Sequence, residues 1–181
     1  MQSLTTALAL GCMAFMLSAC SSLPNDHNLA SYAMTTGVQK PFKINHYNAA
    51  VYEPVYVPRE DPLVPKRDAA YTRLENVIKV TLESKGLHEG EMTDNTIRVR
   101  FGLASEYLLS DAELASAMGL NPGLVTSQED SKLTIGITLI RADTDEILWN
   151  GALQGVMLKG LDPEQRDQRL KQAVATLLSS L

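Results

Sequence analysis

The amino-acid sequence predicts an α+β domain: a two-layer sandwich in which an antiparallel sheet carries two helices packed on one face. Apolar residues recur at helical spacing in residues 68–86 and 162–181. Apolar and polar residues alternate in residues 96–103, 132–141 and 146–158, as they do in half-buried strands. Because each helix must bury an apolar face, this order of elements favours packing of both helices on the apolar face of the sheet.

The first helix is expected to begin at Asp68, whose carboxylate can cap free backbone N–H groups, and to end at Gly86. A glycine followed by an apolar residue, here Leu87, is typical of a left-handed helix end that closes on the last turn. The apolar face of the helix comprises Ala70, Leu74, Val77, Ile78 and Leu82.

Residues 96–103 alternate most clearly. Arg98 and Arg100 belong to the polar face, and the apolar face is formed by Ile97, Val99, Phe101 and Leu103. Asp111–Met118 is then expected to form one or two helical turns that end at Gly119, as an excursion between strands.

A β-hairpin is predicted from residues 132–141 and 146–158, which alternate on either side of a polar break at 143–145. Asp143 and Asp145 are interpreted as turn-forming residues rather than calcium ligands, because the other ligands of a calcium loop are missing. Trp149 falls on the apolar side of its strand, so we expect it in the core.

The C-terminal helix is expected to start at Asp162, Pro163 and Glu164, which supply a capping side chain, a proline at the first helical position and an acid in the first turn. Its apolar stripe comprises Leu170, Val174, Leu177, Leu178 and Leu181. The free face of the sheet, bearing Arg98, Arg100, Thr134 and Thr138, is left to solvent or to a partner.

The N-terminus has the pattern of a bacterial lipoprotein signal. Residues 1–19 carry no charged side chain, and their apolar run is too short to span a membrane comfortably. They end in Leu17, Ser18 and Ala19, which together with Cys20 resemble a lipobox. By this resemblance the signal peptide is cleaved before Cys20, and the cysteine receives the acyl chains, such as palmitate, that anchor the protein in the membrane.

The rest of the N-terminal region predicts a tether and an irregular strand. Residues 20–40 are mostly polar, and their apolar residues follow neither the helical nor the strand period. We therefore expect a lipidated cysteine and a flexible tether ahead of a periplasmic domain at 41–181. Ser21 stands where an inner-membrane retention signal would place Asp, which favours the outer membrane, with the domain facing the periplasm. Residues 42–59 interleave tyrosine and valine with prolines, which predicts an extended strand that the prolines confine to an edge or to irregular structure.

Composition and motifs exclude several functions. A formal net charge of −5 argues against nucleic acid as a partner. Both cysteines, Cys12 and Cys20, precede the predicted domain, so it has no disulfide and no thiolate zinc site. The three histidines, His27, His46 and His88, are scattered, and no nucleophile or phosphate-loop motif is present, so neither a metal, nor a cofactor, nor a catalytic residue is predicted.

The chain resembles the family of small bacterial lipoproteins catalogued as domain of unknown function four-one-three-six. The resemblance covers residues 42–181. It is carried by the lipobox, the helix end Lys85-Gly86-Leu87, the strands at 97–101 and 132–140, and the run Asp145-Glu146-Ile147-Leu148-Trp149-Asn150-Gly151. It implies the fold and the location, and no catalytic residues.

The leading hypothesis is a non-enzymatic, lipid-anchored binding or assembly module of the cell envelope. Its partner would be an envelope protein, a peptidoglycan strand or a lipid. The candidate partner surface is the free sheet face, with Arg98 and Arg100, or the tyrosine-rich segment, with Tyr52 and Tyr56. Two alternatives remain open: a hydrolase of envelope polymers, which requires a polar cleft lined by close carboxylates, and a carrier, which requires an apolar cavity between sheet and helices.

Overall fold

The structure, a computed structural model of the chain, describes residues 32–38, 41–56, 64–120, 122–123 and 131–181. The strands are β1 (Tyr32–Val38), β2 (Ala49–Val55), β3 (His88–Glu89), β4 (Thr96–Ala104), β5 (Lys132–Arg141) and β6 (Ile147–Val156). The helices are α1 (Val64–Glu83), α2 (Asp111–Met118) and α3 (Pro163–Leu177), with 3-10 turns at Ile44–His46 and Leu178–Ser180.

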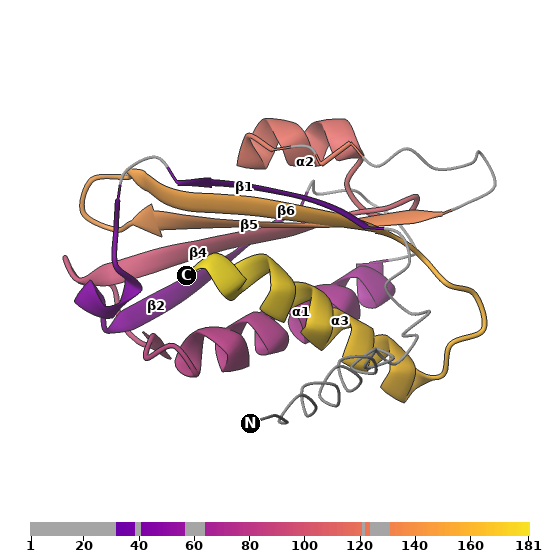
Figure 1. Cartoon of the computed structure of the whole chain (residues 1–181), viewed down its shortest axis with the longest axis horizontal. Coiled ribbons are helices and arrows are strands. Elements are labelled where there is room, and N and C mark those ends of the chain that lie inside the picture. The colour runs from indigo at the N-terminus through magenta and orange to yellow at the C-terminus, as the bar shows by residue number, and fades with distance from the viewer. Residues whose placement is uncertain (1–31, 39–40, 57–63, 121, 124–130) are drawn as a thin grey trace, which may run out of the picture.

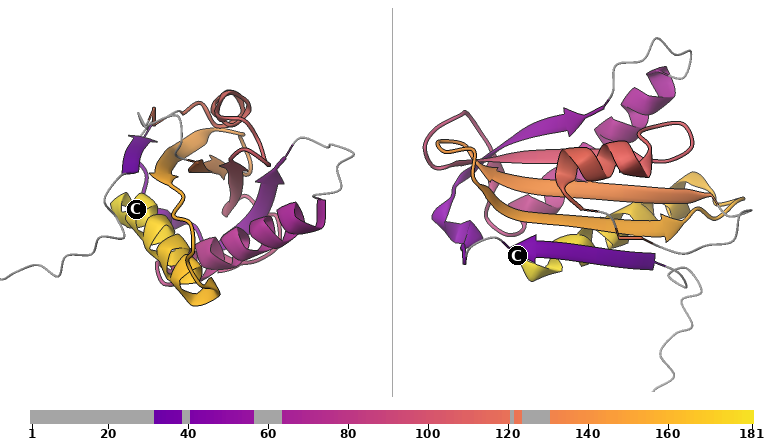
Figure 2. Two further views of the ribbon diagram at one scale, coloured as in Figure 1. Left: turned by 90° about the vertical axis from the view of Figure 1, so that its right-hand side faces the viewer. Right: turned by 90° about the horizontal axis from the view of Figure 1, so that it is seen from above.

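The strands form one six-stranded sheet in the order β1-β6-β5-β4-β2-β3. Figure 1 shows α1 and α3 on one face of this sheet and α2 on the other. The end view in Figure 2 shows the same arrangement, with α1 and α3 together beneath the curved sheet. The predicted α+β class, with two helices packed on one face of the sheet, is therefore confirmed.

The sheet is mixed, which corrects the prediction that all its strands are antiparallel. β1, β6, β5 and β4 pair antiparallel, whereas β2 runs parallel to both β4 and β3. The reason lies in the connection, because α1 carries the chain back across the sheet between β2 and the strands that follow it. A helix-length crossover of this kind joins parallel strands.

Strand β1 corrects the predicted extent of the tether. Tyr32–Val38 lies inside the segment expected to be flexible, yet it pairs antiparallel with β6 along its whole length, from Tyr32 opposite Gly155 to Val38 opposite Trp149. The segment shows no apolar period because β1 is an edge strand. It satisfies its backbone on a neighbouring strand while its own side chains are exposed or half-buried.

Helix α1 begins at Val64, four residues before the predicted cap at Asp68. Pro65 lies in its first turn, where the missing N–H of proline costs nothing. Asp68 is thus inside the helix, where its carboxylate accepts a hydrogen bond from Nε of Arg67 (3.3 Å). The predicted end is confirmed: Gly86 adopts a left-handed φ of 88°, and the N–H of the buried Leu87 donates to the carbonyl oxygen of Leu82 (3.1 Å).

The starts of α2 and α3 depend on local capping, and both are close to prediction. Ser110 and Glu113 form a reciprocal capping box at α2, and Asp162 and Gln165 form one at α3, which has Pro163 in its first turn. Each box satisfies backbone N–H groups that lack a partner within the helix. The bounds of these helices are therefore encoded within a few residues.

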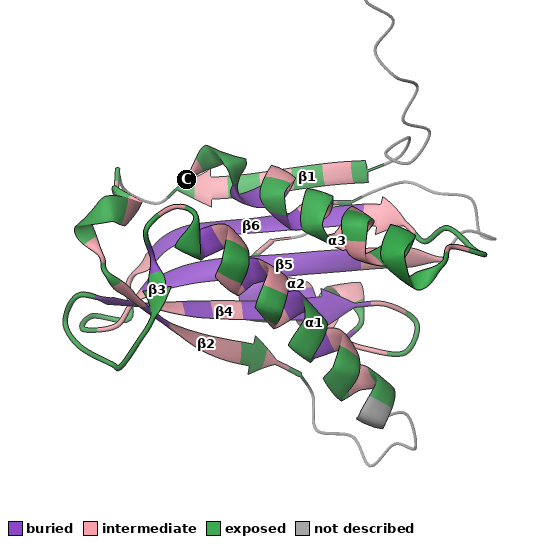
Figure 3. Ribbon diagram, turned by 90° about the horizontal axis from the view of Figure 1, so that it is seen from below, coloured by how far each residue is buried: buried purple, intermediate pink, exposed green. Residues whose placement is uncertain are grey.

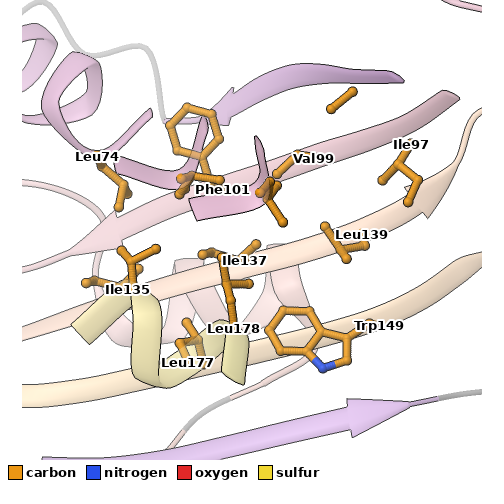
Figure 4. Close-up of a cluster of buried hydrophobic side chains, with 14 of the residues drawn as sticks. Leu74, Ile97, Val99, Phe101, Ile135, Ile137, Leu139, Trp149, Leu177 and Leu178 are labelled. Carbon is orange, nitrogen blue, oxygen red and sulfur yellow. The ribbon is translucent and has the colours of Figure 1, made fainter. Parts of the chain in front are cut away.

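The main core lies between the sheet and the helices α1 and α3. Figure 3 shows the buried middle strands beneath the two helices, and Figure 4 shows the side chains that meet there. The predicted apolar faces are confirmed, since Leu74, Ile78, Phe101, Ile137 and Leu177 are fully buried. Burial of each such side chain stabilises the fold by about 1.5–3 kcal/mol.

A smaller cluster seats α2 on the opposite face. Gly102 of β4 pairs with Gly136 of β5, and the side chains of Leu114 and Met118 from α2 lie over them. A Cβ on Gly102 would approach Cδ1 of Leu114 to 2.8 Å, and one on Gly136 would approach Cγ of Met118 to 3.1 Å. The two glycines therefore provide the close approach that α2 requires.

Candidate functional site

A pocket of about 360 Å³ lies between the sheet and the helices α1 and α3. It is located where both helices begin and where β4 and β6 end. Most of its lining is apolar, and the residues are Tyr32, Ala70, Arg73, Leu74, Leu103, Ser105, Leu108, Leu133, Ile135, Leu153, Gly155, Val156, Met157, Leu158, Leu161, Arg166, Arg169, Leu170, Ala173 and Thr176. The volume falls at the lower end of the range of about 300–1,000 Å³ found for small-molecule sites.

The pocket exists because small residues stand where the two helices face the ends of the strands. Leu103, Ile135 and Leu153 point to the helices by strand alternation and form its roof. Opposite them, α1 contributes Ala70 and α3 contributes Ala173. Alanine at both positions leaves space that a larger side chain would fill, so the core is less completely packed at this end of the sheet.

Large apolar side chains remain exposed around this pocket. Tyr32, Met157 and Leu158 all line it, and their exposed fractions are 44%, 48% and 42%. They come from the start of β1 and from the segment that joins β6 to α3. Exposed apolar side chains are usually scattered singly over a protein surface. Several of them clustered beside an apolar cavity are typical of a ligand site.

Three arginines supply the charged side chains of the lining, as far as the described residues form it. Arg166 donates from Nε to the carbonyl oxygen of Leu161 (3.0 Å), and Arg169 donates from Nη2 to the carbonyl oxygen of Val156 (3.3 Å). Arg73 pairs with Asp167 on α3, with 3.3 Å between Nε and Oδ1. Neither Asp nor Glu is among the described lining residues.

The predicted partner surface is divided between the two faces of the sheet. Arg98 and Arg100 lie on the face opposite α1, where both contact Glu53 of β2 at 3.3 Å, and Arg98 also pairs with Asp145 in the hairpin turn. Their exposed side-chain fractions are 18% and 36%. The two arginines thus form part of an ion-pair cluster that ties β4, β2 and the hairpin together.

The two tyrosines of that surface pack against α1 instead. The ring of Tyr52 lies 5.0 Å from the ammonium group of Lys79, and burial raises the pKa of Tyr52 to about 12, partly opposed by the positive charge of Lys79. Tyr56 contacts Tyr71 edge-to-face at 5.8 Å and lies beneath the guanidinium of Arg67. The structure therefore does not bring the four predicted residues into one surface.

The sheet face predicted to be free is partly covered by α2. Thr134 and Thr138 are buried there: Thr134 donates to a carboxylate oxygen of Asp111 (2.8 Å), and Thr138 donates to the sulfur of Met118 (3.2 Å). Gln154 joins the network by donating to Asp111 (3.0 Å). In the sequence these polar residues alternate with apolar ones and therefore look solvent-facing. Their partners lie on α2, whose packing on this face of the sheet the alternation does not indicate.

Other functional predictions fall on parts that the structure does not describe. The lipobox residues Leu17, Ser18, Ala19 and Cys20 lie outside the described residues. Within the described ranges, no helix is long and apolar enough to cross a membrane. The same part of the chain contains no group of three or more His, Cys, Asp or Glu side chains that could hold a metal ion.

The pocket was not located from the sequence, although a carrier with an apolar cavity between sheet and helices was one of the alternatives that the sequence left open. Its walls come from α1, α3 and the ends of the four strands β1, β4, β5 and β6, and their meeting depends on the sheet order. The available signal was the pair of alanines, Ala70 and Ala173, on the apolar faces of the two helices. Such alanines are common in packed cores, so the signal is weak on its own.

Comparison with known proteins identifies the family. The model described as "Domain of unknown function (DUF4136)" matches residues 28–180, which include the sheet, the three helices and the pocket. The chain belongs to this family. The match confirms the resemblance recognised in the sequence. A search of curated proteins finds no match to the chain.

Solved structures similar to this DUF4136 chain are distant from it in sequence. A PelC dodecamer from Paraburkholderia phytofirmans has 10% identity and a TM-score of 0.48, covering 82% of this chain and 95% of its own. A PDZ domain protein from Parabacteroides distasonis has 12% identity and a TM-score of 0.48, covering 84% of this chain and 37% of its own. A putative neuraminyllactose-binding hemagglutinin homolog from Helicobacter pylori has 14% identity and a TM-score of 0.31, covering 76% and 81%.

Proposed function

We propose that the protein is a lipid-anchored lipoprotein of the outer membrane whose periplasmic domain is a non-enzymatic binding module for an apolar ligand. The observation that carries the binding part is the apolar pocket between the sheet and the helices α1 and α3. Of the hypotheses drawn from the sequence, the carrier of an apolar ligand required such a cavity. The anchor and the location rest on Leu17, Ser18, Ala19, Cys20 and Ser21.

The pocket favours binding over hydrolysis. A glycan hydrolase uses two carboxyl groups placed on either side of the scissile bond. The described lining of this pocket has no carboxylate, and Glu53 on the opposite face is held between Arg98 and Arg100. Apolar walls instead stabilise a bound chain or ring by about 0.8 kcal/mol per buried methylene.

Filling the pocket is expected to weaken binding strongly. We would measure binding of the neutral fluorescent probe N-phenylnaphthylamine to the full-length chain carrying Cys20→Ser, which prevents attachment of the anchor. Ala173→Phe places a ring among the lining residues and should weaken binding about tenfold or more. The matched control is Ala175→Phe, which puts the same ring on the exposed side of α3 and should leave the affinity unchanged.

A second pocket variant, Ala70→Phe, fills the cavity from α1. It shows whether the loss of binding comes from filling the pocket and not from a distortion of α3. Thermal unfolding by circular dichroism shows whether each variant is folded. Absence of probe binding to the unfilled protein, or equal binding by the folded Ala173→Phe and Ala175→Phe variants, would rule out the pocket as the site.

Lipidation is tested at the two N-terminal cysteines. In cells fed with radiolabelled palmitate, Cys20→Ser should abolish labelling, because the cysteine sulfur accepts the diacylglycerol group. The matched control, Cys12→Ser, removes the other thiol of the chain and should leave labelling and membrane fractionation intact. Retention of label by the Cys20→Ser protein would contradict the proposed anchor.

A further inference from the structure

We propose that the end of the domain at which the pocket lies rests against the lipid layer that holds the anchor, so that the apolar ligand passes between the membrane and the pocket without crossing water. This inference rests on the proposed function, because it uses both the pocket and the lipid on Cys20. Three features of the molecule support it: the position of the exposed apolar side chains, the length of chain between Cys20 and the sheet, and the position of the acidic loops.

The directions of the strands define two ends of the domain. β1 and β5 begin, and β2, β4 and β6 end, where α1 and α3 also begin and where the pocket lies; we call this the pocket end. The left view in Figure 2 looks onto it. The turn at residues 142–146, which joins β5 to β6, lies at the opposite end, which we call the hairpin end.

Most of the exposed large apolar side chains of the described residues lie at the pocket end. They come from the start of β1, the segment after β2, the loop after β4 and the segment after β6, and they are Tyr32, Tyr56, Tyr107, Met157 and Leu158. The others, Met34, Val38, Val80 and Met92, are spread over β1, α1 and the loop before β4. The pocket end is therefore the most apolar part of the described surface.

The side chains at the pocket end suit the interface of a lipid layer. Tyrosine has an apolar ring and a polar hydroxyl group, and it is enriched where hydrocarbon meets head groups. Met157 and Leu158 are apolar side chains of the kind that interfacial segments bury at the boundary of the acyl chains. Since Tyr32, Met157 and Leu158 also line the pocket, an apolar ligand that moves along them stays in contact with apolar surface.

The length of chain after Cys20 brings the same end to the membrane. Tyr32 is the first residue of β1 and lies at the pocket end, twelve residues after Cys20. Twelve residues reach roughly 40 Å when fully extended. The sheet is about 33 Å long, from the ten residues of β5 at about 3.3 Å each. The hairpin end could face the lipid only if the chain ran almost fully extended past the whole sheet.

The distribution of charge favours the same orientation. The loops at the hairpin end, residues 90–95 and 142–146, contain five acidic residues and no basic residue in the sequence: Glu91, Asp94, Asp143, Asp145 and Glu146. At the pocket end, residues 105–110 and 157–162 contain two acidic residues and one lysine. Because a membrane that contains anionic lipid repels an acidic surface, the hairpin end is directed away from it.

The test measures which end of the lipid-anchored protein contacts lipid. Met157→Cys is labelled with a thiol-reactive nitrobenzoxadiazole dye in the purified, acylated protein. The matched control is Met92→Cys at the hairpin end, because the two methionines are similarly exposed (48% and 53%). Acylation occupies the sulfur of Cys20, and Cys12 leaves with the signal peptide, so the added cysteine carries the free thiol.

Each labelled protein is reconstituted into vesicles of phosphatidylethanolamine and phosphatidylglycerol, in which some lipids carry a nitroxide quencher near the head group. We expect blue-shifted emission and about twofold or greater quenching at residue 157, because interfacial side chains lie roughly 5–10 Å within the head-group region. The dye at residue 92 should show neither effect. Tyr107→Cys is a second labelling position at the pocket end, used if the protein labelled at residue 157 is unfolded by circular dichroism.

A charge at the pocket end should release it from the lipid. Tyr107→Asp places a carboxylate at the interface and should remove most of the quenching at residue 157. The matched control is Val80→Asp on α1, which changes an equally exposed side chain (67%, against 66% for Tyr107) and should leave the quenching unchanged. Tyr107 is not among the described lining residues, so both variants should bind the naphthylamine probe as the unmodified Cys20→Ser chain does.

Sedimentation with vesicles, probe binding and quenching separate this inference from the proposed function. In a protein that sediments with the vesicles and binds the probe, quenching at neither position, at residue 92 alone or equally at both would overturn the contact of the pocket end with lipid and leave an anchored binding module. A blue shift at residue 157 without quenching would show that a second protein molecule covers this end, which also overturns the contact. Failure to sediment with the vesicles would overturn the anchor and the contact together.

Discussion

Replacing Trp149 with alanine is expected to lower the free energy of unfolding by about 3–5 kcal/mol, the largest loss of stability that we predict for a single substitution. The indole is fully buried between β6 and α3. Its loss removes apolar contacts and leaves a cavity that the packed sheet and helix around it cannot fully close. Urea unfolding is followed by circular dichroism and not by indole fluorescence, since Trp149 is the only tryptophan in the chain.

The control for this substitution is Ser180→Ala. The indole Nε1 donates to Oγ of Ser180 (3.3 Å), so this variant removes the hydrogen bond and leaves the packing. We expect a loss of about 1 kcal/mol or less, because the bond is only partly buried. Equal losses for the two variants would show that the hydrogen bond, and not the burial of the ring, dominates the contribution of Trp149.

The second large effect is expected at Gly151, where alanine should destabilise the fold by about 1–3 kcal/mol. A Cβ at this position would lie 2.4 Å from Cη2 of Trp149 and 2.9 Å from Cδ1 of Leu177. The indole lies across the backbone of its own strand, and only glycine leaves room for it. Urea unfolding of Gly151→Ala tests this expectation.

A double-mutant cycle identifies the cause. In a Trp149→Ala background the closest obstruction is gone, and the next nearest atom to the new Cβ is Cδ1 at the end of the flexible side chain of Leu177. The cost of Gly151→Ala should then fall below about 1 kcal/mol, giving a coupling energy of the size seen for residues in contact. Additive effects of the two substitutions would contradict a steric role for Gly151.

These packing relations explain the run of residues that links the chain to its family. On the face of β6 that packs against α3, the indole of Trp149 fits only because residue 151 is glycine. Between them, Asn150 points to the other face and donates to the carbonyl oxygen of Met118 at the end of α2 (3.4 Å). Three successive residues therefore join the sheet to α3 on one side and to α2 on the other, so the motif is structural.

Features encoded by neighbouring residues were predictable. Alternation placed Phe101 and Trp149 in the core, and the capping residues placed the starts of α2 and α3. Each of these signals acts within a few residues, because a helix cap or a strand face depends on local backbone geometry and on one buried side. The same reasoning failed at Asp68. This residue is a good helix cap, but it lies inside α1, which begins at Val64 because proline is tolerated in the first turn of a helix.

Features that depend on pairing between distant segments were not predictable. β1 has no apolar period of its own and is a strand only because β6 offers a free edge. β2 is parallel to β4 because α1 crosses the sheet between them. Thr134 and Thr138 are buried because Gly102 and Gly136 admit α2 to the second face.

The candidate site belongs to this second class. No segment of the sequence marks the pocket, because it is the space left where two helices with small residues meet the ends of four strands. From the sequence, Arg166 and Arg169 look like ordinary solvated residues of the C-terminal helix. In the structure, hydrogen bonds to the carbonyl oxygens of Leu161 and Val156 hold them at the wall of the cavity. Local patterns thus dictated the helices, the core and the strands other than β1 and β3. The order of the strands, the covering of the second sheet face by α2 and the cavity depend on long-range packing. Residues far apart in the sequence decide together whether a given space in the fold is filled or left empty.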